Sequence, residues 1–200
     1  WIDIGCGTGV LTSTILATCE PTEVVGIDSS DTFLRSATAT VTDRRVSFMQ
    51  GDAQTLPQPD DRFDVAVSGL VLNFVPDKDA AVREMARVVR PGGTIALYVW
   101  DYAGHMQVMR TFFDVATALD PKAVEYDDGV KAPICRPKPL SELLERNGLR
   151  DVEVRAIDIP AAFASFETAS AVATRPSIPG RCAIRTRRTS EERSDSPATP

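Results

Sequence analysis

The chain has 200 residues, of which 43% are hydrophobic, and it carries a formal net charge of −6 with a pI near 4.9. One domain of this length can bury a sizeable core, and no apolar run approaches the roughly 18 residues of a membrane helix. The acidic balance argues against a large electropositive surface for nucleic acid. We therefore expect a globular protein with no membrane segment and no nucleic-acid partner.

The four cysteines are scattered, with no Cys-x-x-Cys pair; they are Cys6, Cys19, Cys135 and Cys182. This spacing suggests neither a zinc site nor a disulfide framework. We expect no metal ion and a reducing, cytoplasmic compartment.

The first residues predict a strand, a tight glycine turn and the start of a helix. The apolar run 1–4 leads into Gly5, Gly7 and Gly9, and a helix-like stretch follows over 10–17. Glycine lets the backbone approach a ligand closely, and free N–H groups at a helix start attract an anionic group. Because the chain opens inside this strand and without a Met, we expect its natural start to lie upstream.

The glycine spacing separates two cofactors. A dinucleotide fingerprint requires G-x-G-x-x-G/A, whereas here the third glycine comes one residue early and Val10 stands at the last position. The run Asp-Ile-Gly-Cys-Gly-Thr-Gly, which starts at Asp3, resembles the first motif of class I S-adenosylmethionine (SAM) dependent methyltransferases. The resemblance implies that Asp3, Gly5, Gly7 and Gly9 bind SAM, whose methionine carboxylate suits a helix N-terminus. A generic glycine-rich turn is the alternative.

The second strand, expected over 23–27, ends in an acid. Asp28 stands 19 positions after the last glycine of the turn. An acid at this point, roughly 20 residues beyond the glycines, can accept hydrogen bonds from both ribose hydroxyls, and the resemblance implies this role for Asp28, with Ser29 beside it. The alternative is an N-cap for the helix expected over 32–42, although Ser30 could serve as that cap equally well.

A third strand, over 46–50, is followed by Gly-Asp-Ala. In the resembled family this Asp accepts from the exocyclic amine of adenine, and the next backbone N–H meets a ring nitrogen. The resemblance therefore implies that Asp52 and Ala53 hold the adenine. A turn-forming Asp is the alternative interpretation.

Two later segments extend the resemblance. Residues 63–68 read Phe-Asp-x-x-x-Ser, and a helix expected over 77–89 runs into Arg-x-x-Arg-Pro-Gly-Gly. Both look like later motifs of the same family, in its ubiquinone-biosynthesis-like (methyltransferase type 11) branch, which makes Ser68 a further candidate cofactor residue. The Asn-Pro-Pro-Tyr type motif of nucleobase methylation is absent at this place, which disfavours a DNA substrate.

Strands and helices alternate through the first hundred residues. This predicts an α/β fold: a Rossmann-like, doubly wound, mostly parallel sheet with helices on both faces. Right-handed crossovers bring the carboxyl ends of the strands to one edge, where ligands of such sheets bind. We therefore predict that the glycine turn, Asp28, Asp52 and Ser68 line one composite pocket.

Residues 101–137 interrupt this alternation. The resemblance implies that such an insertion after the fifth strand forms part of a lid over the acceptor; core packing plus a solvated loop is the alternative. A helix is expected over 106–119, with one apolar face. That face comprises Met109, Phe112, Phe113 and Ala116. His105, the single histidine, is a candidate general base because it follows the fifth strand, and a structural or solvated histidine is the alternative.

The carboxyl-terminal part changes character. A short helix over 141–147 and a sixth strand over 151–159 are expected, but no seventh strand is identified. Residues 166–200 hold six arginines and no lysine among many Ser, Thr and Pro residues. We predict a domain over 1–165, truncated at the start of its first strand, and a disordered or non-native tail; a basic tail for an anionic partner is the alternative.

The function predicted is transfer of a methyl group from SAM to a small-molecule acceptor. The sulfonium of SAM carries the chemistry, so the protein mainly aligns the acceptor and excludes water. One alternative is a non-catalytic SAM-binding protein or inactive fragment, which the missing seventh strand and unusual tail would suit. Another is an NAD-dependent oxidoreductase, which the glycine spacing disfavours. The acceptor, the methylated atom and the oligomeric state are not evident from the sequence.

Overall fold

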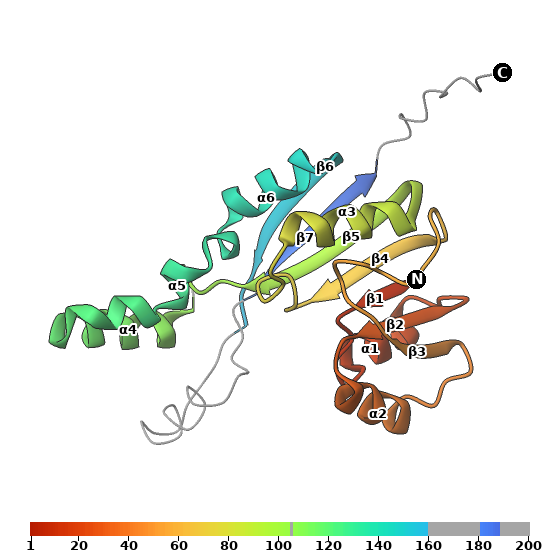
Figure 1. Cartoon of the computed structure of the whole chain (residues 1–200), viewed down its shortest axis with the longest axis horizontal. Coiled ribbons are helices and arrows are strands. Elements are labelled where there is room, and N and C mark those ends of the chain that lie inside the picture. The colour runs from red at the N-terminus through yellow and green to blue at the C-terminus, as the bar shows by residue number, and fades with distance from the viewer. Residues whose placement is uncertain (105, 160–180, 189–200) are drawn as a thin grey trace.

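The computed structural model of the chain describes residues 1–104, 106–159 and 181–188. The elements follow the alternation expected from the sequence (Figure 1). In chain order they are β1 (Ile2–Ile4), α1 (Val10–Thr18), β2 (Val24–Asp28), α2 (Asp31–Thr40), β3 (Val46–Gln50), β4 (Phe63–Gly69), α3 (Lys78–Val88), β5 (Val89–Trp100), α4 (Gln107–Leu119), the 3₁₀ helix η1 (Pro121–Tyr126), α5 (Asp128–Lys131), the 3₁₀ helix η2 (Pro133–Cys135), α6 (Pro137–Arg146), β6 (Leu149–Ile157) and β7 (Arg181–Arg188).

The strands form one sheet in the order β3-β2-β1-β4-β5-β7-β6. The five strands from β3 to β5 are parallel, whereas β7 is antiparallel to both of its neighbours. The order reverses direction at β1, so that the chain winds outward to β3 on one side and to β4 and β5 on the other. This confirms the Rossmann-like, doubly wound fold and places the switch point between β1 and β4.

The presence of β7 corrects the expectation that a seventh strand is lacking. It pairs with β5 from Trp100↔Arg181 to Thr94↔Arg187, and with β6 on its other side. Arginine occupies four of its eight positions, so the segment is short of the apolar residues by which a strand is recognised. The backbone pairing accommodates such a sequence, and its register places Ile184 opposite Leu97 of β5. The predicted boundary at residue 165 stays a prediction, because residues 160–180 and 189–200 lie outside the described part.

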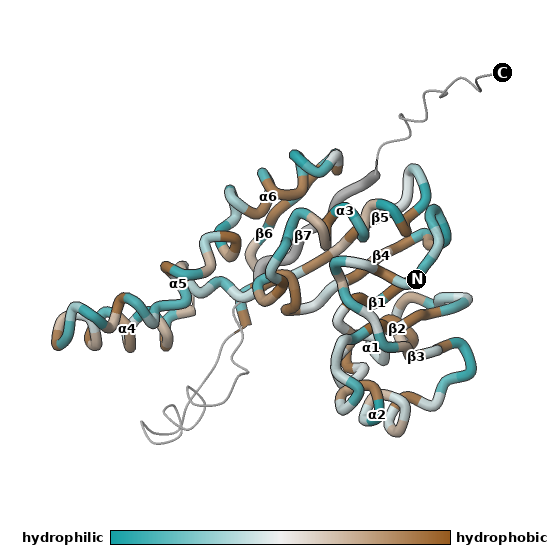
Figure 2. The backbone as a smooth tube through the Cα atoms, viewed as in Figure 1, coloured by the Kyte–Doolittle hydropathy of each residue, from teal (hydrophilic) through white to brown (hydrophobic). Residues whose placement is uncertain are grey.

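Helices cover the sheet on both faces. The main core lies under α3 and α6 and is formed by fully buried side chains of strands and helices. It includes Ile4, Ile27, Met85, Leu97 and Leu143. A smaller cluster under α1 contains Ile15, Val24 and Val67. Hydrophobic residues concentrate along the central strands (Figure 2), as a sheet buried on both faces requires.

Local signals in the sequence set the ends of the helices. The Ser30 side chain accepts from the Phe33 N–H at the start of α2, and Asp77 accepts from the Ala80 N–H at 2.8 Å at the start of α3. Both are ordinary N-caps. Helix α3 ends at Val88, before the Pro-Gly-Gly segment, which becomes part of β5. Among the described residues no helix is long and apolar enough to cross a bilayer.

The segment from α4 to α5 forms an arm that projects from the body at the end farthest from β1–β3 (Figure 1). Helix α4 confirms the helix expected after β5. The prediction that its apolar residues form one face packed in the core is correct only in part. Phe113 is buried, whereas Phe112 is 58% exposed and points away from the packed side. The centroids of the two rings are 5.1 Å apart, and the rings form a T-shaped, edge-to-face pair.

Candidate active site

A cavity of about 370 Å³ lies at the carboxyl ends of the first strands. Its walls come from four separate turns of the chain. The lining residues are Gly5, Ile27, Asp28, Ser29, Gly51, Asp52, Ala53, Gln54, Val71, Phe74, Val75 and Pro76. Three segments named from the sequence thus meet here: the glycine turn, the end of β2 and the Gly-Asp-Ala segment. Parallel strands place these ends at one edge, as predicted.

The wall formed by residues 71–76 was not predicted from the sequence. This segment follows β4, and it closes the cavity opposite the acids with Val71, Phe74 and Val75. The sequence could have indicated this wall, because the segment connects a strand to the following helix. In a parallel sheet all such connections lie at the carboxyl edge, where ligands bind. Leu70, at its start, has φ of +62°, a strained conformation for a bulky residue and one typical of functional turns.

The glycine turn has the geometry that the motif predicts. Gly5, Gly7 and Gly9 have φ of +73°, +55° and +83°, values that side-chain-bearing residues rarely adopt. A Cβ on Gly5 would lie 2.2 Å from Val71, so this glycine is required by close packing. A Cβ on Gly7 would meet no protein atom within 4 Å. The backbone there is therefore open on the side where a ligand would approach.

The start of α1 leaves its backbone N–H groups available. Gly9 is its N-cap in the left-handed conformation, and no side chain caps the helix. There is also no acidic residue in the first turn. Uncapped N–H groups and the helix dipole favour a small anion at this point.

Asp28 ends β2 and joins two parts of the site. Its Oδ2 accepts a 2.9 Å hydrogen bond from the Gly7 N–H, and its Oδ1 accepts a 2.8 Å bond from the Ser30 N–H. A carboxylate has about four acceptor positions, so two remain for ligand hydroxyls. The cap of α2 is Ser30, not Asp28. The alternative interpretation of Asp28 as an N-cap is therefore wrong.

Asp52 lines the cavity and also organises a turn. Its Oδ1 accepts from the Gln54 backbone N–H at 2.8 Å and from the Gln54 side-chain amide at 3.1 Å. These bonds hold the pKa of the Asp52 carboxyl below its usual range. Both interpretations of this residue are thus compatible: the carboxylate shapes the turn and, ionised, faces the cavity as an acceptor.

Asp3 lies behind the glycine turn and is fully buried. The Thr12 hydroxyl donates a 2.6 Å hydrogen bond to its Oδ2, while its Oδ1 has no hydrogen-bond partner. Burial raises the pKa of this carboxyl to about 6. An orphaned, buried acceptor costs free energy unless a donor reaches it.

Four residues predicted to bind the cofactor do not line the cavity, namely Asp3, Gly7, Gly9 and Ser68, and His105 cannot be placed. Ser68 is buried, and its hydroxyl donates a 2.8 Å hydrogen bond to the Ile4 carbonyl, which joins β4 to β1. Gly9 acts at the helix start and is absent from the cavity wall. His105 lies outside the described residues. None of the lining residues belongs to the insertion 101–137.

Comparison with known proteins identifies the family. Residues 2–97 match the family Methyltransf_11, described as a methyltransferase domain. A demethylmenaquinone methyltransferase of Roseiflexus sp. (strain RS-1) is 32% identical over 171 residues, which are 80% of this chain and 72% of that protein. The chain belongs to the class I SAM-dependent methyltransferases.

Other relatives agree with this class I methyltransferase assignment and its ubiquinone-biosynthesis-like branch. UbiE, a ubiquinone/menaquinone biosynthesis C-methyltransferase of Shewanella sp. (strain ANA-3), is 36% identical over 119 residues; they are 57% of this chain and 47% of UbiE. The chain thus matches about half the length of that relative. The methyltransferase solved with the Trm112 activator of Haloferax volcanii has the same fold, with a TM-score of 0.68 at 23% identity over 94% of this chain and 81% of that one.

The family membership also settles the class of activity. The chain is an enzyme that transfers a methyl group from SAM to a small-molecule acceptor. Membership of this family implies SAM as the methyl donor, in agreement with the spacing of the glycines.

Proposed function

We propose that the cavity at the switch point binds SAM and that the acceptor is a quinone-type aromatic ring, methylated at carbon. The observation that carries the first part is the meeting of the open glycine turn, Asp28 and Asp52 around one cavity of about 370 Å³. The donor set fits SAM, because ribose hydroxyls and an adenine amine are donors and both acids are acceptors. The second part is supported by the names of the relatives, a demethylmenaquinone methyltransferase and a C-methyltransferase.

Each residue of the site has a separate role in this proposal. The uncapped N–H groups at the start of α1 bind the methionine carboxylate, and Asp3 Oδ1, which lacks a donor, accepts from the ammonium group. Asp28 accepts from the ribose hydroxyls, while Asp52 and the Ala53 N–H hold the adenine. When bound, SAM supplies an electrophilic methyl group on its sulfonium. The protein then aligns the acceptor atom and keeps water away.

The rim of the cavity supports an apolar, aromatic acceptor. Phe74 is 69% exposed on the rim, and Val71 and Val75 lie beside it. Beyond the ends of β4 and β5, Trp100 and Met106 form a buried apolar cluster. An exposed aromatic ring at a cavity mouth is suited to stacking on another ring. His105 stays our candidate for the base that takes a proton from a ring hydroxyl.

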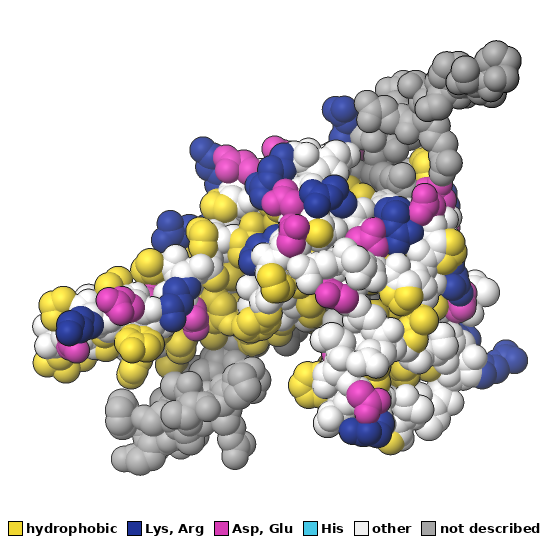
Figure 3. All heavy atoms as spheres, viewed as in Figure 1, with side chains coloured by type: hydrophobic (Ala, Val, Ile, Leu, Met, Phe, Trp, Pro, Cys, Tyr) yellow, Lys and Arg dark blue, Asp and Glu magenta, His cyan; other side chains and the backbone are white. Residues whose placement is uncertain are grey.

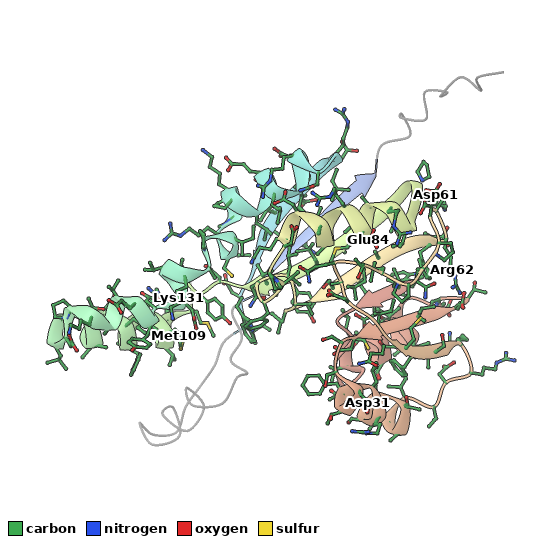
Figure 4. All side chains as sticks on the ribbon, viewed as in Figure 1. Asp31, Asp61, Arg62, Glu84, Met109 and Lys131 are labelled. Carbon is green, nitrogen blue, oxygen red and sulfur yellow. The ribbon has the colours of Figure 1, made fainter. Side chains whose placement is uncertain are left out.

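The cofactor proposal is tested by calorimetric titration with SAM, S-adenosylhomocysteine and NADH. We expect the first two to bind and NADH not to bind. Asp28→Ala should weaken SAM binding roughly 10- to 100-fold, corresponding to about 1–3 kcal/mol for lost hydrogen bonds to a charged group. Asp31→Ala is the matched control, because Asp31 is an exposed acid on α2 whose partner is Arg35 (Figure 4). Binding of NADH in place of SAM would refute the proposal.

The acceptor proposal is tested by methyl transfer from SAM to a reduced naphthoquinone with a free ring position. Catechol and a primary amine serve as comparison acceptors. We expect transfer to the ring carbon of the quinol and little to the other two. Phe74→Ala should raise KM for the quinol while SAM affinity stays unchanged. SAM binding without transfer to any acceptor would instead support the non-catalytic alternative.

A further inference from the structure

An apolar stripe runs along the outer face of α4. Val108, Phe112, Val115 and Leu119 follow one another at spacings of four, three and four residues, so they form one continuous seam on the helix. Phe112 is 58%, Val115 56% and Leu119 84% exposed. The seam therefore faces solvent over most of the length of the helix.

The other face of α4 is already packed and holds the helix in place. Phe113 is buried, and Met109 packs against the cluster of Trp100 and Met106. Arg110 forms a two-pronged ion pair with Asp127, including a 2.9 Å contact from Nη1 to Oδ2. Figure 4 places Met109 and Lys131 at the base of the arm, where α4 meets α5. The seam is thus presented outward by an anchored helix.

Exposed apolar side chains are concentrated on this arm. Six of the eleven large hydrophobic side chains that are exposed among the described residues lie within residues 112–130. They are Phe112, Val115, Leu119, Val124, Tyr126 and Val130. In Figure 3 the arm shows hydrophobic side chains along much of its length, with Lys, Arg, Asp and Glu side chains among them. A concentration of this kind on a monomer marks an interaction surface.

We propose that this seam is a two-fold interface with a second copy of the chain, α4 packing against α4 of the partner. The side chains that flank the seam are uncharged, so two copies bring no like charges together. These flanking residues are Gln107, Thr111, Ala116 and Ala118. An isologous contact is the commonest arrangement for identical chains. An anionic membrane surface fits less well, because residues 101–131 hold six acids and three bases.

The exposed apolar area of the seam determines how tightly two copies should associate. Aromatic side chains bury roughly 150–250 Å² each and aliphatic ones somewhat less, so Phe112, Val115 and Leu119, which are 56–84% exposed, offer an area on the order of 350 Å² per copy. The total from the seam is then about 700 Å², the size of a small, transient interface. We therefore expect weak association, with a Kd on the order of 100 µM.

Sedimentation equilibrium of the whole chain, from about 1 to 300 µM, tests this. We expect a monomer–dimer equilibrium, and Phe112→Lys should raise its Kd more than about 30-fold because it places a charge in the buried centre of the interface. Phe33→Lys on α2 is the matched control, since Phe33 is 49% exposed and lies on another helix. Both positions are exposed, so both variants should keep the wild-type secondary structure in far-UV circular dichroism. A wild-type chain that stays monomeric throughout overturns the proposal, and so does a dimer that Phe112→Lys leaves intact.

A charge-exchange experiment distinguishes a second copy from other occupants. Val115 lies near the middle of the seam, so a two-fold contact brings it close to its own counterpart. Val115→Lys and Val115→Glu should each be largely monomeric, and an equimolar mixture should associate at least tenfold more tightly than either. If the mixture associates no more tightly than either variant alone, the proposal is overturned. The wild-type chain could instead stay monomeric and pellet with phosphatidylcholine vesicles, while Phe112→Lys does not pellet. That result would overturn the proposal in favour of a lipid surface.

Discussion

The backbone N–H of Gly7 donates a 2.9 Å hydrogen bond to Oδ2 of Asp28. This bond joins the turn after β1 to the acid that ends β2, across 21 positions of the sequence. The same carboxylate accepts from the Ser30 N–H through its other oxygen. The residue proposed to hold the ribose therefore also holds the glycine turn in shape.

Replacing Asp28 should consequently affect both ends of SAM. We expect Asp28→Ala to weaken binding of adenosine, through the lost ribose bonds, and of methionine, through a loosened turn. Asp52→Ala should weaken binding of adenosine only, because Asp52 bonds within its own turn to Gln54. Titration of each variant with SAM, adenosine and methionine separates these effects. Unchanged methionine binding in Asp28→Ala would show that the Gly7 bond does not shape the site.

Gly7→Val should abolish SAM binding while the far-UV circular dichroism stays native. The residue has φ of +55°, which a β-branched side chain resists, and its Cβ would project into the open side of the turn. Gly148→Val is a matched control: Gly148 has φ of +84° and also has no atom within 4 Å of an added Cβ, but it follows α6. The control should lose comparable stability and keep its SAM affinity. Equal SAM affinities in the two variants would refute the assignment of the turn.

The buried carboxyl of Asp3 predicts a pH dependence of stability. Its pKa rises from 3.8 to about 6 on folding, so between these values the folded chain keeps a proton that the unfolded chain has lost. The free energy of unfolding should therefore fall as the pH rises through this window, by about 2–3 kcal/mol from this group alone. In Asp3→Asn this pH-dependent contribution to the free energy of unfolding is absent.

Urea unfolding of wild type and Asp3→Asn, without SAM and from about pH 4 to 7, measures the difference. We expect the stability of the variant relative to wild type to increase with pH across the window. Comparing the two proteins cancels the contributions of other carboxyls, such as Asp43, whose pKa the Arg45 bonds lower to about 2. A difference that is constant with pH would contradict the raised pKa.

Ser68→Ala should lower stability without changing SAM affinity. The hydroxyl donates to the Ile4 carbonyl inside the sheet, and a buried carbonyl left without its donor costs about 1–2 kcal/mol. Ser47→Ala, at an exposed position of β3, should be close to neutral. Urea unfolding and calorimetry measure the two properties. A loss of SAM affinity at unchanged stability would instead support the role that the sequence motif implies.

Truncation after residue 165 should destabilise the whole domain. It removes β7, which pairs with β5 along Thr94–Trp100 and links β6 to the rest of the sheet. We expect a loss of several kcal/mol, a large part of the roughly 5–15 kcal/mol typical of a domain, and a lower melting temperature. A chain ending at Arg188 keeps all seven strands and should melt as the full chain does. Equal melting temperatures for the two truncated chains would show that β7 contributes nothing.

The sequence alone determined the parts of the site that depend on local chemistry. Glycines at alternate positions require a turn of positive φ, and acids that follow apolar runs mark strand ends, so Gly5, Asp28 and Asp52 could be named without a structure. They could also be placed together, because parallel strands joined by right-handed crossovers end at one edge. The same reasoning correctly predicted the doubly wound sheet from β1 to β5.

The tertiary structure alone decided what depends on contacts between distant segments. Three features depend on such contacts: the closing of the cavity by Val71 and Phe74, the inward bond of Ser68 and the outward direction of the α4 seam. Strand β7 is the clearest case. Its arginine-rich sequence lacks the apolar pattern of a strand, and only the backbone hydrogen bonds offered by β5 and β6 make it one.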